Sequence, residues 1–337
     1  IYPTSAGIGQ TQWRNLCQQA LDHVQRIDIK DLLPNASSNS FDLIQALQYL
    51  HAPPPDAPQE MLREGSHPAQ LRLALEELVA HNLSLRQLRA RHQRDGAPAL
   101  PYQHDMRAAF LSKLSFTPTA AQEKVCQEIA DDLIKPYPML RLVQGDVGSG
   151  KTLVAACAAL QAIGSGYQVA IMAPTEILAE QHWHNFSNWF DPLGISKEWL
   201  TGRLKGSKRD RAIDRIASGD AALVVGTHAL FQAGVTFSNL GLVIVDEQHR
   251  FGVHQRLALT EKADPAVGRA HQLVMTATPI PRTLSMVAYA DLDCSIIDEL
   301  PPGRRPVSTV LIDSDRRGEI VERVANACQQ GRQAYWV

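Results

Sequence analysis

The sequence predicts an α/β protein in which a parallel sheet follows an all-helical region. From about residue 106 onward, short apolar runs alternate with helical stretches, which is the pattern of an open parallel sheet with helices on both faces. Before that point the sequence shows helical periodicity and almost no strand pattern. Of the 337 residues, 45% are hydrophobic and 20% are charged, which excludes a disordered or collagen-like chain.

Amphipathic helices are predicted throughout residues 1–105. They are expected at 13–24, at 41–50 and from Pro68 to Leu88, where the proline suits a first helical turn. Proline-rich residues 51–58 separate the second helix from the third, and residues 96–101 end the region. Arginines 86, 89, 91 and 94 indicate either a solvated helix face or a basic contact for nucleic acid.

Five buried strands are predicted after residue 106, because continuous apolar runs suit strands covered on both faces of a parallel sheet. The runs are residues 140–143, 169–172, 222–225, 242–245 and 273–275. Helices are expected between them, at 153–163 and 177–190. In such a sheet, functional loops lie at the carboxyl ends of the strands.

Charge and cysteine content narrow the class of protein. Thirty-three Lys and Arg against 35 Asp and Glu give a net charge of −2, so a nucleic-acid site would have to be local. No apolar run approaches the roughly 20 residues that span a bilayer, so no membrane contact is expected. The five cysteines are scattered without metal-ligand spacing, which predicts reduced, mostly core thiols in a cytoplasmic protein.

A phosphate-binding loop is predicted where a strand is followed by an Ala-rich helix. Its cofactor-binding residues are Gly145, Asp146, Val147, Gly148, Ser149, Gly150, Lys151 and Thr152. Backbone N–H groups of such a loop converge on phosphate oxygens at the positive end of the helix. Lys151 is expected to contact the β- and γ-phosphates, and the Thr152 hydroxyl to coordinate Mg²⁺.

Two carboxylates, Asp246 and Glu247, directly follow the apolar run at 242–245. Charges in this position are costly unless a cation or a proton transfer uses them. Asp246 is therefore predicted as a second Mg²⁺ ligand, and Glu247 as the residue that orients or deprotonates an attacking water. With the phosphate loop, they predict an ATP-hydrolysing site.

Several further motifs resemble those of superfamily 2 helicases of the DExH type. Residues 246–249 resemble the DExH motif, residues 173–182 resemble motif Ia, and residues 275–283 resemble an extended motif III. Motif Ib would correspond to residues 201–202 and motif Ic to residues 226–228. Residues 116–122 resemble the Q-motif, which reads adenine. The resemblance implies a RecA-like P-loop NTPase domain over residues 106–303. It implies catalytic roles for Lys151, Asp246, Glu247, Gln248 and His249, and adenine recognition by Phe116 and Gln122. It also implies DNA-phosphate contacts from Thr175, Gly202, Arg203, Thr227 and His228, with Thr276 and Thr278 coupling them to the γ-phosphate.

Three runs are similar to those of the RecG family of bacterial branched-DNA helicases, and the resemblance covers essentially the whole chain. They are residues 145–152, 246–253 and 276–284. Gln248 and Ser149 favour this family over the transcription-repair coupling translocases, which usually carry Glu and Phe there. The resemblance implies an ATP-driven double-stranded-DNA translocase that remodels stalled forks and Holliday junctions. It further implies a bacterial, cytoplasmic, nucleoid-associated monomer that uses ATP and Mg²⁺, with single-stranded-DNA-binding protein as a further partner.

The same resemblance places the chain within a longer protein. It implies a wedge domain before the chain and a second motor lobe of which residues 304–337 are only the start. Because related motors take an arginine finger from that lobe, we expect the chain alone to bind ATP but hydrolyse it weakly. Three alternatives stay open: a transcription-repair coupling translocase, an RNA-remodelling DExH protein, and a regulatory module that binds nucleotide as a switch without hydrolysis.

Overall fold

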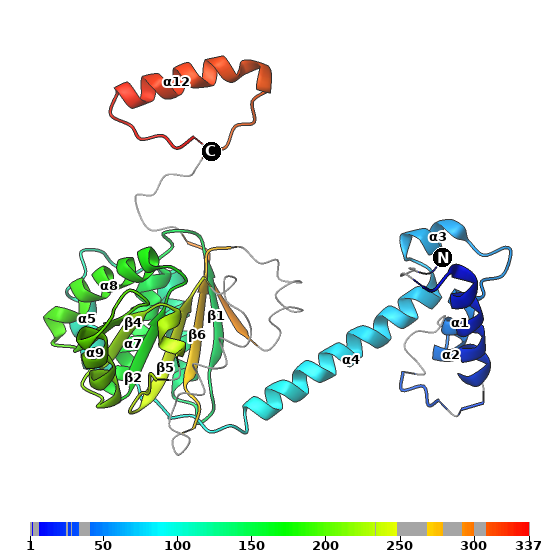
Figure 1. The fold of residues 1–337 in the computed structure, drawn as a ribbon, viewed down its shortest axis with the longest axis horizontal. Helices are drawn as coiled ribbons and strands as arrows, with labels where there is room; N and C mark the ends of the chain where they lie inside the picture. The colour runs from blue at the N-terminus through cyan, green and yellow to red at the C-terminus, as the bar shows by residue number, and fades with distance from the viewer. Residues whose placement is uncertain are drawn as a thin grey trace.

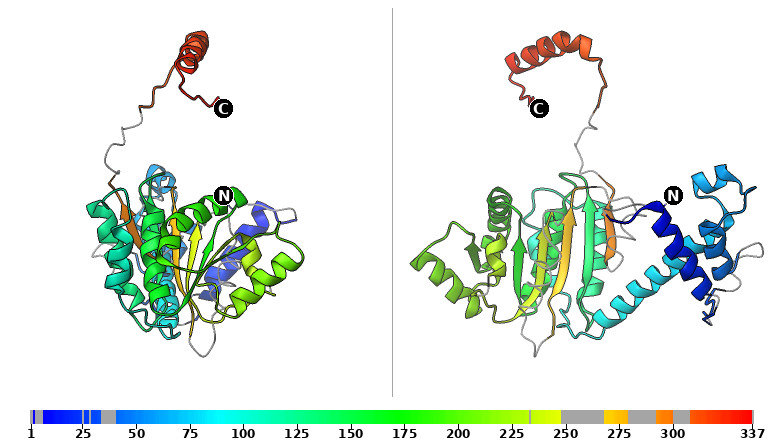
Figure 2. Two further views of the ribbon diagram at one scale, coloured as in Figure 1. Left: turned by 90° about the vertical axis from the view of Figure 1, so that its left-hand side faces the viewer. Right: turned by 45° about the vertical axis from the view of Figure 1, so that its right-hand side comes forward.

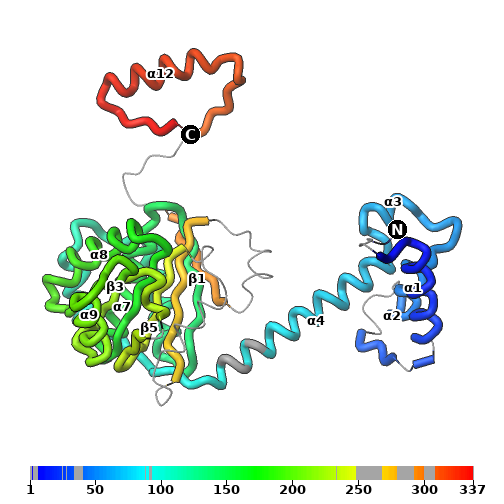
Figure 3. The backbone as a smooth tube through the Cα atoms, viewed as in Figure 1, coloured from blue at the N-terminus to red at the C-terminus, as the bar shows by residue number. Residues whose placement is uncertain are grey.

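The computed structural model describes residues 2, 7–24, 26–27, 29–33, 41–232, 234–247, 268–278, 292–299 and 308–336, without the side chains of 88, 91 and 92. A group of helices at the amino end is joined to an α/β domain by one long helix (Figure 1). The tube view follows this connection along the chain (Figure 3). The predicted order, helical region first and parallel sheet second, is confirmed.

The helical region is built around the amino end of the long helix. Its elements are α1 (Gln10–Val24), α2 (Leu43–His51), α3 (Gln59–Glu64) and α4 (Pro68–His92). Arg72 of α4 is buried and forms ion pairs with Asp31 at 2.7 Å and Glu76 at 2.5 Å, which fastens α4 to the segment before α2. The sequence did not predict α3, because six residues carry too little periodicity.

In the described part of the chain, parallel strands form one seven-stranded sheet in the order β3-β4-β2-β5-β6-β1-β7. The strands are β1 (Leu140–Gly145), β2 (Gln168–Met172), β3 (Lys197–Leu200), β4 (Leu223–Gly226), β5 (Leu240–Asp246), β6 (His271–Thr276) and β7 (Asp293–Ile297). The five predicted strands are all present. The two that the sequence did not predict, β3 and β7, lie at the sheet edges, where strands need no continuous apolar run.

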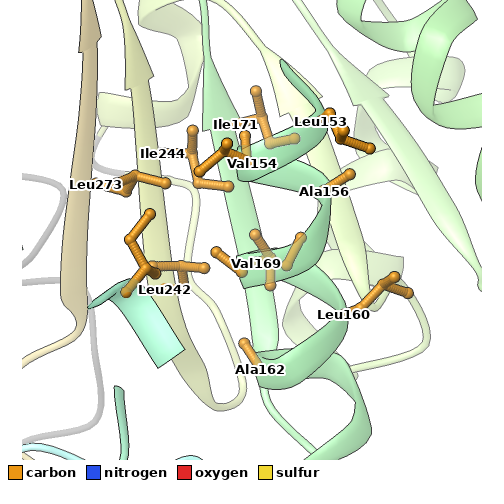
Figure 4. Close-up of a cluster of buried hydrophobic side chains, with 14 of the residues drawn as sticks. Leu153, Val154, Ala156, Leu160, Ala162, Val169, Ile171, Leu242, Ile244 and Leu273 are labelled. Atoms are coloured by element: carbon orange, nitrogen blue, oxygen red, sulfur yellow. The ribbon is translucent and has the colours of Figure 1, made fainter. Parts of the chain in front are cut away.

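Helices cover both faces of the sheet (Figure 2). One face packs against α5 (His104–Leu111), α6 (Ala120–Leu133), α7 (Lys151–Gly164) and α8 (Glu176–Phe190), and the other against α9 (Ser207–Ala217) and the short helix η2 (His228–Phe231). Alternation along a strand divides its side chains between the faces: Val169 and Ile171 join the first core, Ala170 and Met172 the second. Figure 4 shows the first core, where α7 packs on the strands.

The segment between α4 and α5 packs against the sheet. Leu100 is fully buried in the first core, the backbone N–H of Arg269 donates to Gly96 O at 2.7 Å, and His271 Nε2 bonds Pro98 O at 2.7 Å. The core of the α/β domain therefore includes residues before 106, the position at which the strand pattern begins.

The remaining described elements lie after β2 and at the carboxyl end. They are η1 (Asp191–Leu193), η4 (Ser314–Arg316) and α12 (Arg317–Gln329), and α12 has no buried residue. Cys126 is buried, whereas Cys294 and Cys328 are exposed, so the prediction of core thiols is wrong for these two. None of the described helices has the length and apolar character that crossing a membrane requires.

Candidate nucleotide site and nucleic-acid loops

Three neighbouring strands bring the predicted nucleotide-site residues to one edge of the sheet. In the order β5-β6-β1, Asp246 pairs with Met275, and Thr276 pairs with Gln144. Because parallel strands end on the same side, the phosphate loop, the two carboxylates and the end of β6 meet there.

The phosphate loop can only be built with glycine at particular positions. Gly148 and Gly150 have φ angles of 78° and 93°, in the left-handed region. A Cβ on Gly150 would meet Gln122 Nε2 at 2.2 Å, and a Cβ on Gly145 would meet Ser149 Oγ at 2.4 Å. The loop is therefore a tight backbone cradle that ends at the first residue of α7, where the helix presents free N–H groups to an anion.

Lys151 holds its ammonium group inside this loop. Its Nζ donates to Gly145 O at 2.7 Å and to Asp146 O at 3.0 Å. Burial lowers the pKa of Lys151 below its usual range, whereas the nearby carboxylates of Asp246, Glu247 and Asp146 act to raise that pKa. The lysine, the loop and both carboxylates therefore form one electrostatic site.

The two carboxylates at the end of β5 have different partners. Asp246 Oδ2 lies 2.7 Å from Nε2 of His182 on α8. Glu247 has a φ of 52°, and it is the only residue other than glycine with a positive φ in the described ranges. Its Oε1 accepts a hydrogen bond from the Ala277 backbone at 3.1 Å. A strained backbone at such a position is typical of functional sites.

The side-chain oxygens of Thr152 and Asp246 suit a magnesium ion that is bound jointly by the protein and a nucleotide. Mg²⁺ prefers hard oxygens and is usually held by one or two protein groups together with substrate phosphates. Thr152 is the second residue of α7, directly after the phosphate loop, and Asp246 lies two strands away at the same edge of the sheet. Among the described residues, no group of three or more His, Cys, Asp or Glu could hold a metal by itself. The residues present therefore fit Mg²⁺ bound with a nucleotide.

Gln122 is tied to the start of α6 and to the phosphate loop. It forms a capping box with Thr119, and its Nε2 donates to Ser149 O at 2.7 Å. The residue is 3% exposed, whereas Phe116 is 49% exposed. Adenine recognition by these two residues stays a prediction.

The predicted DNA contacts come from loops after β2, β3 and β4, which are adjacent in the sheet. Thr175 caps α8 by accepting from the Leu178 N–H at 3.3 Å. The side chain of Arg203 is 87% exposed and pairs with Glu176 at 2.5 Å. A Cβ on Gly202 would lie 3.8 Å from Cε1 of His228, so these two loops touch.

Thr227 differs from the other four predicted contacts. It is 2% exposed, and its hydroxyl is buried with no hydrogen-bond partner in the described part of the chain. The structure therefore does not bring this hydroxyl to the surface where a DNA phosphate would lie. Thr227 directly follows β4, a strand buried along its whole length, and its own side chain is buried as well.

The predicted coupling residues lie beside Glu247. Thr276 is buried, and its Oγ1 accepts from the Thr278 N–H at 3.2 Å. With the bond from Ala277 to Glu247, the segment after β6 contacts the predicted water-orienting carboxylate. The predicted catalytic residues Gln248 and His249, residues 250–253, and the part of motif III after Thr278 lie outside the described residues.

Sequence reasoning assigned no role to two residues of this region. His182 contacts Asp246, and Glu299 Oε2 accepts from the Ala121 N–H at 3.0 Å, at the start of α6. A signal for His182 exists: it stands among Ala179, Phe186 and Phe190 on the inward face of α8, where an apolar side chain is the usual choice.

Comparison with known proteins places this fold and site in a family. The DEAD/DEAH box helicase family model matches residues 119–287, and the chain belongs to this family. Along its whole length it is similar to the ATP-dependent DNA helicase RecG, with 58% identity to the Haemophilus influenzae protein and 57% to that of Escherichia coli K12. The alignment covers 100% of this chain and 49% of each relative, so the chain spans about half their length. A solved structure of RecG bound to a three-way DNA junction superposes with a TM-score of 0.75 at 36% identity, covering 98% of this chain and 44% of that one.

Proposed function

We propose that the protein containing this chain is an ATP-dependent DNA helicase that remodels branched DNA, and that this chain carries its ATP site. The observation that carries the proposal is the meeting of a phosphate cradle, Lys151, Asp246 and Glu247 at one sheet edge. The similarity to RecG, one member of which is bound to a three-way junction in its structure, supports branched DNA as the substrate. Stalled forks and Holliday junctions are the DNA forms we expect.

We assign each residue of the site a task in phosphoryl transfer. The cradle and Lys151 would hold the phosphates and balance the charge of the leaving group, and Thr152 and Asp246 would hold Mg²⁺. When bound, Mg²⁺ would supply positive charge against the negative charge of the phosphate oxygens. Glu247, fixed by its bond to Ala277, would orient the attacking water in line with the bond that breaks.

The loops after β2, β3 and β4 suit a motor that moves along any DNA sequence. The groups there are the hydroxyl that caps α8 (Thr175), a glycine backbone (Gly202), a guanidinium (Arg203) and an imidazole (His228). Such groups can bind successive phosphates without reading bases. We also propose a monomeric, cytoplasmic protein that associates with the bacterial nucleoid and meets single-stranded-DNA-binding protein there.

Nucleotide binding is tested on this chain with a fluorescent (mant) ADP and Mg²⁺. Lys151→Ala should abolish measurable binding, because the cradle then lacks its cation. Lys113→Ala is the matched control, since that lysine donates to the Pro192 carbonyl in an exposed hydrogen bond and makes no contact with the loop that the described structure shows. Equal affinity of Lys151→Ala and wild type would remove Lys151 from the site.

Turnover and substrate are tested on the full-length protein. Glu247→Gln should keep nucleotide binding and lower fork-stimulated ATP hydrolysis by orders of magnitude, as loss of a group that acts only in the transition state does. Competition among forked, duplex and single-stranded DNA and RNA separates the alternatives. Preference for the fork supports the proposal, preference for RNA supports an RNA-remodelling protein, and binding without any turnover supports a nucleotide switch.

A further inference from the structure

His182 occupies a position that its own packing does not explain. It lies on the inward face of α8 and is 5% exposed, with its ring 6.4 Å from that of Phe186. Its Nδ1 is buried and has no hydrogen-bond partner among the residues that the structure describes. A buried polar atom without a partner costs about 1–3 kcal/mol, a penalty that a leucine of similar size would avoid. The contact that accounts for a histidine at this position is therefore the one made by its other ring nitrogen, Nε2.

That other nitrogen makes a single short contact. His182 Nε2 lies 2.7 Å from Asp246 Oδ2, and the two side chains are only 7% and 13% exposed. Because an ionised carboxylate only accepts hydrogen bonds, Nε2 is the ring nitrogen that carries the hydrogen in this pair. The bond engages Oδ2, one of the two oxygens of a carboxylate that stands at the edge where the phosphate loop lies.

From this geometry we infer that His182 is a positioning residue that holds the Asp246 carboxylate in the orientation that Mg²⁺ requires. The inference rests on the proposed function, since it concerns the same ATP site. A carboxylate on a strand end can rotate about two bonds, and a fixed donor on a neighbouring element removes that freedom before the metal arrives. Residues that hydrogen-bond a metal ligand in this way typically contribute tenfold to a hundredfold to metal affinity.

The helix that carries His182 is itself well anchored. Phe186 and Phe190 are fully buried in the first core, and Thr175 caps its first turn. Thr175 and His182 are seven positions apart, which is about 10 Å along the helix axis. The bond to Asp246 therefore joins the metal ligand to the same rigid element that begins at a predicted DNA loop.

The test measures Mg²⁺-dependent binding of mant-ADP to this chain, without any turnover. His182→Leu removes the donor, and it should weaken binding about tenfold or more in the presence of Mg²⁺ while leaving binding in EDTA unchanged. His182→Gln supplies an amide N–H near the position of Nε2 and should restore most of the Mg²⁺-dependent affinity. His184→Leu is the control, because it alters an exposed histidine two residues away on the same helix.

The outcomes separate the inference from its alternatives. Equal weakening of His182→Leu in Mg²⁺ and in EDTA would mean a general packing role, and unchanged Mg²⁺-dependent affinity would mean that the bond has no role. A glutamine variant as weak as the leucine variant would also overturn the inference. If the wild-type chain binds no mant-ADP in Mg²⁺, the proposed function fails instead. Thermal unfolding of each variant confirms that it is folded.

Discussion

Replacing Gly150 by alanine tests whether the phosphate loop and Gln122 are built as one unit. The substitution has two costs that the structure separates. The φ of 93° is in the left-handed region, which costs a non-glycine residue about 1–2 kcal/mol. The new Cβ would also meet Gln122 Nε2 at 2.2 Å and Gln122 Cδ at 3.0 Å, so this buried amide must leave its place.

Displacing the amide breaks the bond from Gln122 Nε2 to Ser149 O, and it disturbs the capping box that begins α6. A buried polar group left without its partner costs about 1–3 kcal/mol. Together with the backbone strain, Gly150→Ala should lower the free energy of unfolding by about 2–5 kcal/mol. The measurement is urea unfolding of the chain followed by circular dichroism.

Two comparisons isolate the second cost. Gly166 has a φ of +86° and nothing within 4 Å of a built Cβ, so Gly166→Ala should lose only the strain, about 1–2 kcal/mol. In a Gln122→Ala background, Gly150→Ala should also fall to that smaller loss, because the clashing amide is gone. The reasoning is refuted if Gly150→Ala and Gly166→Ala are equally stable. It is also refuted if Gly150→Ala lowers the free energy of unfolding by the same amount with and without the Gln122 side chain.

Two further predictions concern stability. Burial lowers the pKa of His271 in the folded protein below its ordinary value of 6.5, so this histidine binds a proton more readily in the unfolded chain. Its neutral form therefore contributes fully to the free energy of unfolding above about pH 6.5, and that contribution is lost as the pH falls below this value. Both ring nitrogens of His271 form hydrogen bonds to the backbone, and a glutamine side chain can replace both bonds. His271→Gln should therefore show a smaller fall in melting temperature between pH 7.5 and 5.5 than the wild type. An equal fall would contradict this. Arg141→Leu leaves the carboxylates of Asp132 and Glu128 without their shared partner. It should lower the free energy of unfolding by about 2 kcal/mol, because the energy of a partly buried ion pair lies between that of a surface pair and that of an interior pair. Arg316→Leu, which removes only an exposed pair, should lower stability much less than Arg141→Leu does. Similar losses for both variants in urea unfolding would show that the burial of Arg141 has no effect.

Local patterns were sufficient to predict the elements that are buried on both sides or defined by turn chemistry. The apolar runs correspond to the central strands, and the glycines of the phosphate loop stand where positive φ angles and close backbone contacts exclude a Cβ. These features depend on each segment's own side chains and backbone, so they can be recognised without the rest of the fold. The edge strands β3 and β7 lack such a pattern, since one side of each needs no partner strand.

The leucines of α4 show the limit of periodicity. Leu71, Leu75 and Leu78 predict a helix by their spacing, and the helix is present, but all three are exposed in the described structure. Spacing reports which residues share a face of the helix, and it contains no information about what that face contacts.

Only the tertiary structure decided which residues meet at the site. The order β5-β6-β1 places Thr276 between the carboxylates and the phosphate loop, and the packing of α8 brings His182 to Asp246 across 64 residues of sequence. It also buried the hydroxyl of Thr227, which the motif alone assigned to DNA. The physical reason is that side-chain chemistry and spacing are local properties of the chain, whereas contacts between distant segments follow from strand order and helix packing, which the burial of the whole core determines.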